Sequence, residues 1–128
     1  MLSSKSIRAV LVGAVVAIVT TTLIDVALHA THVYPPLDQP IDDALALLAS
    51  SYRLVIGVGA GFLTARLAPN RPLQHALVLG AIGAAVSLAG VVSTWNLDLG
   101  PKWYPISLVF LAIPQAWVGA SLLRARTS

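Results

Sequence analysis

The sequence predicts an all-α membrane protein, a four-transmembrane-helix bundle with the N and C termini in the cytoplasm. Of its 128 residues, 57% are hydrophobic and only 10% are charged, and the mean hydropathy is +0.84. A soluble domain carries about 25% charged residues. Four apolar runs are each close to the roughly 20 residues that a helix needs to cross the hydrocarbon core. We therefore expect residues 1–128 to form a single integral membrane domain.

The first expected span covers residues 9–31 and follows the basic segment MLSSKSIR. Because backbone polar groups in lipid must be satisfied within their own segment, the span should be a helix. A basic segment before an apolar run is also typical of a secretory signal, but this run is long. The candidate cleavage site VALHA also has Leu28 where a small residue is needed. We expect the helix to remain uncleaved.

The second expected span covers residues 42–67. It follows the loop HVYPPLDQPIDD, whose prolines separate it from the first span. Asp42 and Asp43 suit the positive N-terminal end of the helix that begins there. The turn RLAPNRP then ends the span.

The third and fourth expected spans cover residues 74–95 and 105–123. They are joined by NLDLGPKWYP, in which Pro105 suits the first turn of a helix because its missing N–H is not needed there. Pro114 lies in the middle of the fourth span. It removes one backbone hydrogen bond and frees the carbonyl of Phe110, which predicts a kink.

The charged residues beside the spans predict the orientation. Six basic residues flank one side: Lys5, Arg8, Arg66, Arg71, Arg124 and Arg126. The other side carries a single basic residue and four acidic ones: Lys102, Asp38, Asp42, Asp43 and Asp98. We therefore expect a multi-pass membrane protein with both termini in the cytoplasm and the aspartate-rich loops outside. An aromatic belt should mark the outer interface, formed by Tyr34, Trp95, Trp103 and Tyr104.

Arg53 is the most informative residue, because it lies inside the second span. At 1.5 Å per residue it is roughly 15 to 20 Å from either end of its helix. An unpaired arginine near the bilayer centre costs between about 2.5 and about 17 kcal/mol, so it needs a partner or water. Asp25 is the acidic residue inside another span. We expect an ion pair between them, either as a polar centre for a solute, proton or anion, or as a buried link that fixes helix pairing.

Further polar residues extend this candidate intramembrane site. His29 follows Asp25 by one helical turn, with His32 beyond it and Thr21 and Thr22 inward. This stripe is either a proton path or half of a metal site, or it marks the place where the helix leaves the membrane. Gln115 and Ser87 are candidates to line a cavity together with Arg53.

Small residues recur at helical spacing in the second and third spans, and Gly57 and Gly61 form a GxxxG motif. Such residues let helix backbones approach closely. The expected helix-packing seam comprises Gly57, Gly61, Gly80, Gly83, Ser87 and Gly90. Arg53 shares the small face of its helix, so it should point into the bundle.

No catalytic constellation is recognisable, and we expect no cofactor, no resident metal and no nucleic-acid partner. GVGAG lacks the spacing and the lysine of a nucleotide-binding loop. The expected partners are the lipid bilayer and, as two open alternatives, a second copy of the chain or another membrane protein. Two functions remain open: a structural or accessory membrane protein, and a small transporter or channel for a proton, ion or small solute. An enzyme acting on lipid or quinone is the least supported.

Several segments together resemble a family of small, uncharacterised bacterial membrane proteins with four spans. They are VYPP, SYR with the glycine-rich run after it, TARLAPNRPLQHALVLG, GPKWYP and AIPQAWVGASL. The resemblance covers nearly the whole chain. It implies the four-helix topology and, as the location, a bacterial cytoplasmic (inner) membrane. It implies no activity, substrate or cofactor.

Overall fold

The computed structural model describes residues 4–36, 39–97 and 100–127. Four helices make up most of this part of the chain: α1 (Ser4–Ala30), α2 (Asp43–Leu67), α3 (Pro72–Thr94) and α4 (Trp103–Thr127). Each is long and apolar enough to cross a membrane. The all-α, four-helix prediction is therefore confirmed over the described residues, where no strand occurs. Two of the loop aspartates used to predict the orientation, Asp38 and Asp98, lie outside the described residues.

The helix ends follow the local sequence. Asp42 is the N-cap of α2, and its Oδ1 accepts a hydrogen bond of 2.8 Å from the backbone N–H of Leu45. Pro72 lies in the first turn of α3, where its missing N–H costs nothing. Helix α4 begins at Trp103, with Pro105 in its first turn, and continues through Pro114.

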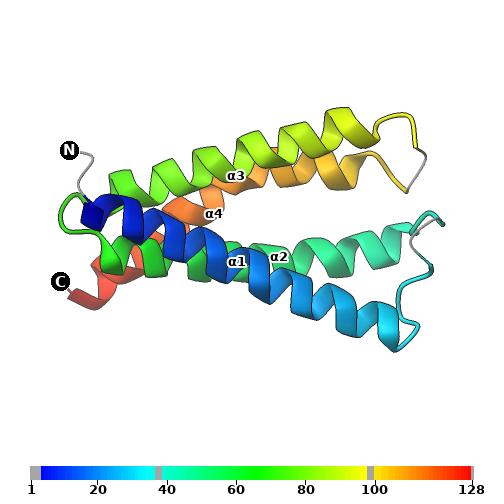
Figure 1. Cartoon of the computed structure of the whole chain (residues 1–128), viewed down its shortest axis with the longest axis horizontal. Coiled ribbons are helices and arrows are strands. Elements are labelled where there is room, and N and C mark those ends of the chain that lie inside the picture. The colour runs from blue at the N-terminus through cyan, green and yellow to red at the C-terminus, as the bar shows by residue number, and fades with distance from the viewer. Residues whose placement is uncertain (1–3, 37–38, 98–99, 128) are drawn as a thin grey trace.

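The helices form two antiparallel pairs, α1 with α2 and α3 with α4 (Figure 1). Both chain termini and the turn between α2 and α3 lie at one end of the bundle, which we call the terminal end. The described parts of the two longer loops, residues 31–36 with 39–42 and residues 95–97 with 100–102, lie at the opposite end, the loop end. The pairs lie close together toward the terminal end and diverge toward the loop end (Figure 1). Helices α2 and α3 each pack against the other three helices, and the larger contacts of α2 are with α4 and α1.

Glycine and alanine produce the close packing between α2 and α4. A Cβ atom added to Gly61 would lie 2.7 Å from Cα of Ala116, and one added to Gly119 would overlap the backbone of Val58. The two helices therefore cross with their backbones in contact, as small residues permit in membrane proteins. Helices α3 and α4 approach similarly, since a Cβ at Gly80 would lie 3.0 Å from the Ala112 carbonyl oxygen.

A hydroxyl group joins α1 to α2 in the same half of the bundle. Thr64 is fully buried, and its Oγ1 donates a hydrogen bond of 3.0 Å to the carbonyl oxygen of Ala9. Gly13 makes room for the Thr64 side chain, because a Cβ there would overlap Oγ1. This contact fixes how α1 lies against α2.

The expected seam ends before the loop end of α3. Gly83 tolerates a Cβ, which would meet only the Ala112 Cβ at 3.6 Å, and a Cβ at Gly90 would meet nothing within 4 Å. Gly90 is exposed, so the small-residue rhythm does not mark a helix contact there. The physical reason is the divergence of the two helix pairs, which leaves this part of α3 without a close neighbour on that side (Figure 1).

The outer surface of the bundle is apolar. Side chains such as Val55, Val92 and Phe110 are each more than 70% exposed in the isolated chain. Exposing this surface to water would cost free energy, whereas lipid chains are as apolar as the surface itself. The buried core consists mainly of alanine, so the fold depends on close helix contact more than on large buried side chains.

Candidate functional site

The candidate site centres on an ion pair between α1 and α2. Nη2 of Arg53 lies 2.7 Å from Oδ2 of Asp25, and the two side chains are 25% and 29% exposed. Arg53 therefore has the charged partner that its place in an apolar helix requires. The remaining exposure shows that packed side chains do not fully enclose the pair.

Tyr52 joins the pair into a larger hydrogen-bonded cluster. Its hydroxyl donates to Oδ1 of Asp25 and accepts a hydrogen bond of 3.0 Å from Nη1 of Arg53. The hydroxyl of Tyr34 lies 2.7 Å from the Tyr52 hydroxyl. Because the single hydrogen of Tyr52 is given to Asp25, Tyr34 is the donor to Tyr52. We call Asp25, Tyr34, Tyr52 and Arg53 the polar cluster.

A tight turn after α1 brings Tyr34 into the polar cluster. His32 adopts the left-handed conformation with φ of 64°, and the backbone N–H groups of Val33 and Tyr34 both donate to the Leu28 carbonyl. The chain thus reverses direction, and Tyr34 is only 7% exposed. The expectation that Tyr34 belongs to an interfacial aromatic belt is wrong, because its ring is buried and its hydroxyl is used inside the bundle.

Helix α4 completes the site with Tyr104. The guanidinium carbon of Arg53 lies 5.8 Å from the centre of the Tyr104 ring and 5.2 Å from that of Tyr52. Both distances fall within the range of cation–π attraction. Arg53 therefore contacts residues of α1, its own helix and α4, and it bridges the two diverging helix pairs.

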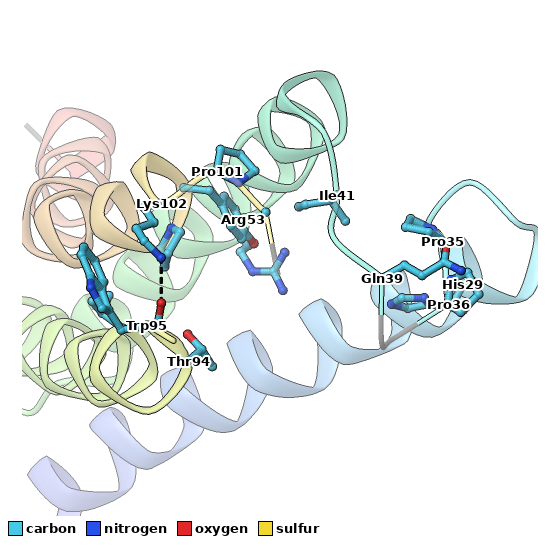
Figure 2. A pocket seen from close by; sticks show the side chains of 14 residues that line it. His29, Pro35, Pro36, Gln39, Ile41, Arg53, Thr94, Trp95, Pro101 and Lys102 are labelled. Atoms are coloured by element: carbon cyan, nitrogen blue, oxygen red, sulfur yellow. Dashed lines mark hydrogen bonds between the residues drawn. The ribbon is translucent and has the colours of Figure 1, made fainter. Parts of the chain in front are cut away.

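A cavity of about 370 Å³ opens beside Arg53 at the loop end. Figure 2 shows the Arg53 side chain between two groups of lining residues, one around Lys102 and Trp95 and the other around His29 and Gln39. All four helices and both loops of this end contribute to the walls. The described lining residues are His29, Pro35, Pro36, Gln39, Ile41, Arg53, Val91, Thr94, Trp95, Gly100, Pro101, Lys102, Tyr104 and Pro105. We call this space the outer cavity.

Lys102 is the second cation of the outer cavity. Its Nζ donates a hydrogen bond of 2.7 Å to the carbonyl oxygen of Trp95 and lies 4.6 Å from the centre of the Trp95 ring (Figure 2). These contacts hold the ammonium group at the cavity wall. A neighbouring bond joins the starts of α2 and α4, where Nε1 of Trp103 donates to Oδ1 of Asp43 at 2.9 Å.

Gln115 and Ser87 lie in a different pocket from Arg53. This pocket has a volume of about 220 Å³ and lies halfway along the bundle, with mostly apolar walls from all four helices. The Gln115 side chain packs directly on Gly57, where an added Cβ would overlap it. We call this space the inner pocket. Gln115 and Ser87 therefore do not line the cavity that Arg53 lines, contrary to the expectation. They lie about one helical turn deeper in the bundle, level with Gly57.

The histidines are divided between different surroundings. His29 lines the outer cavity and lies with its ring centre 5.2 Å from that of Tyr34. His32 lies beyond the end of α1 and is exposed, so it does not continue the helical stripe. Across the described ranges no group of three or more metal-ligating side chains comes together.

Sequence reasoning missed the tyrosines of the site. Tyr52 precedes Arg53 directly, and its position beside an intramembrane arginine was the available signal. Tyr104 was assigned to the interface because it follows a tryptophan at the start of a span. Neither pattern shows that the two rings flank the guanidinium group.

The fold and the site define a class: a helical bundle of the multi-pass membrane type, with a charged cluster and a cavity at its loop end. Searches of protein-family models, curated proteins and solved structures found no match to this chain.

Proposed function

We propose that the protein is an accessory protein of a bacterial cytoplasmic membrane that binds a small molecule in the outer cavity, beside the Asp25–Arg53 pair. In this proposal both termini are cytoplasmic and the loop end faces outward. One observation carries it: the intramembrane arginine lines a cavity, whereas a purely structural ion pair needs none. The function is binding, without chemistry of its own.

The size and composition of the outer cavity support a binding role. Small-molecule pockets commonly have volumes of about 300–1,000 Å³, and they combine apolar walls with a few converging polar groups. The outer cavity, at about 370 Å³, falls in this range. Its proline and aromatic walls are apolar, while Arg53, Lys102 and Gln39 supply polar groups. The polar cluster also holds Arg53 in place before a ligand arrives, which lowers the entropic cost of binding.

The distribution of charge supports the orientation. Lys5, Arg8, Arg66, Arg71 and Arg124 all belong to the terminal end, where helices α1 and α3 begin and α2 and α4 end. Lys102, Asp42 and Asp43 belong to the loop end. Basic residues favour the cytoplasmic side of a membrane. The outer cavity would then open toward the outside.

Cysteine labelling tests this proposal directly, since the chain has no native cysteine. Val91 lines the outer cavity, and its neighbour Val92 is 72% exposed on the apolar outer surface at nearly the same depth. We expect a membrane-impermeant maleimide added outside to modify the Val91→Cys variant and to leave the Val92→Cys variant largely unmodified. Equal modification of the two variants, or modification of Val91→Cys only from the cytoplasmic side, would overturn the proposal.

A small transporter is the second candidate, and the position of the outer cavity at one end of the bundle, beside Arg53, favours it. The close crossing of α2 and α4 at Gly61 and Gly119 lies between the cavity and the terminal end. A carrier would need a second state in which this crossing opens. It would allow the Val91→Cys variant to be labelled from either side in turn, whereas the binding protein allows labelling only from outside.

A further inference from the structure

The outer cavity and the inner pocket are lined by adjacent turns of α2 and of α3. Arg53 of the outer cavity and Gly57 of the inner pocket are one turn apart on α2. Val91 and Ser87 have the same relation on α3. One turn of helix rises by about 5.4 Å, so the two spaces are neighbours along the bundle axis.

The two spaces differ in chemistry. The described walls of the outer cavity include the cations Arg53 and Lys102 and no carboxylate. Asp25, the partner of Arg53, lines a neighbouring hollow on the side of α1, which shares His29, Pro35 and Pro36 with the outer cavity. The walls of the inner pocket are aliphatic or glycine, apart from Ser87 and Gln115. The walls are therefore cationic in the outer cavity and apolar in the inner pocket, which lies deeper along the bundle axis.

We propose that the two spaces form one site for a single-chain amphiphile with an acidic headgroup. The headgroup binds near Arg53 and Lys102, and the hydrocarbon chain extends past Gly57 into the inner pocket, where it displaces the flexible end of the Gln115 side chain that packs on Gly57. This inference rests on the proposed binding function, and it names the class of ligand.

The donors of the outer cavity match an anionic headgroup. The hydrogen bonds from Arg53 to Tyr52 and Asp25 use only some of its guanidinium N–H groups, which leaves donors for a ligand carboxylate or phosphate. Lys102 contributes a second positive charge, whose contacts within the described part of the chain are a neutral carbonyl and an aromatic ring. A cationic ligand would be repelled by the positive charges of both Arg53 and Lys102.

The inner pocket matches a single hydrocarbon chain. Its volume of about 220 Å³ is small, and Gly83 keeps the α3 wall open because it carries no side chain. A short anion such as acetate would leave this apolar space unused. A molecule with two bulky chains would exceed it, so a single chain is the matching shape.

Photo-crosslinking tests the position of the chain. The protein is reconstituted in phosphatidylcholine vesicles with a fatty acid that carries a diazirine at mid-chain, and the adducts are mapped by mass spectrometry. We expect adducts on residues of the inner pocket. Gly83→Leu fills the pocket and should lower these adducts at least about tenfold, because overlap with the new side chain excludes the ligand. Gly90→Leu is the matched control on the same helix, where an added Cβ meets nothing within 4 Å.

The outcomes separate the two proposals. Adducts that spread over the lipid-facing surface and ignore Gly83→Leu overturn the amphiphile site, while outside labelling of Val91→Cys would still support a binding cavity. If Gly83→Leu does not fold, Ser87→Leu provides a second block one turn away on the same wall. Failure of both the labelling and the crosslinking would overturn both proposals.

Competition tests the headgroup at constant chain length. Decanoate, decanol and decyltrimethylammonium are added at equal mole fraction in the bilayer, so that differences in partitioning cancel. We expect decanoate to displace the probe best and the cation least. Lys102→Gln should weaken displacement by decanoate about tenfold, the effect of losing one hydrogen bond to a charged group. Equal displacement by decanol would overturn the acidic headgroup.

Discussion

A double-mutant cycle on Asp25 and Arg53 measures how strongly the ion pair stabilises the fold. Removing one partner from a buried ion pair costs about 3–5 kcal/mol, because the other charge is left without compensation. Here about a quarter of each side chain is exposed, and Tyr52 still donates a hydrogen bond to Asp25 when Arg53 is replaced. We therefore expect Asp25→Asn and Arg53→Gln each to lower the free energy of unfolding by about 2–3 kcal/mol, at or below the lower end of that range.

The double variant distinguishes a pair from two independent residues. If the charges compensate one another, the double variant should cost about 3 kcal/mol instead of the sum, a coupling energy of about 1–3 kcal/mol. The assay is unfolding in mixed detergent micelles with increasing dodecyl sulfate, followed by the fluorescence of the chain's three tryptophans. Arg66→Gln makes the same change at an exposed position of α2 and should have little effect. Costs that add to within about 0.5 kcal/mol would refute the reasoning.

Three further predictions use the same unfolding assay. Tyr52→Phe removes the hydroxyl that joins the polar cluster and should cost about 1–3 kcal/mol; an unchanged midpoint would mean that the cluster adds nothing to stability. Gly119→Ala should cost about 1–3 kcal/mol because its Cβ overlaps the α2 backbone, whereas Gly59→Ala, which meets nothing within 4 Å, should be neutral or slightly stabilising. Equal effects would contradict the close crossing of α2 and α4. Thr64→Val removes a buried interhelical hydrogen bond and should cost about 1 kcal/mol, while Thr94→Val removes only an exposed bond within α3 and should cost less. The reverse order would contradict the link between α1 and α2.

The four helices were predictable from the sequence because lipid imposes a simple requirement. A segment of about 20 apolar residues must satisfy its backbone polar groups internally, so length and hydropathy suffice to find each helix. The position of Asp25 opposite Arg53 was also accessible, since the depth of a residue follows from its distance to the ends of its helix. Both inferences depend on position along a helix and on nothing outside it.

The rest of the site depends on rotations and turns that the sequence does not state. Tyr34 reaches the polar cluster only through the left-handed residue His32, and no glycine or asparagine marks that turn. Gln115 lies one turn too deep to join Arg53, because its place is set by the close contact of α4 with Gly57. Gly90 fits the small-residue rhythm and yet makes no close contact there, since rhythm alone does not show where two helices diverge.

The distribution of small residues explains why the charged cluster lies beside a cavity. Glycine and alanine draw α2 and α4 together at Gly61 and Gly119, and Thr64 fixes α1 in the same half of the bundle. Toward the loop end such close contacts give way to prolines and aromatic rings, and the helix pairs diverge (Figure 1). A divergence in a purely apolar bundle would fill with lipid chains. Arg53 and its partners make this one polar, and this combination of divergence and charge is the basis for proposing a ligand with a charged head.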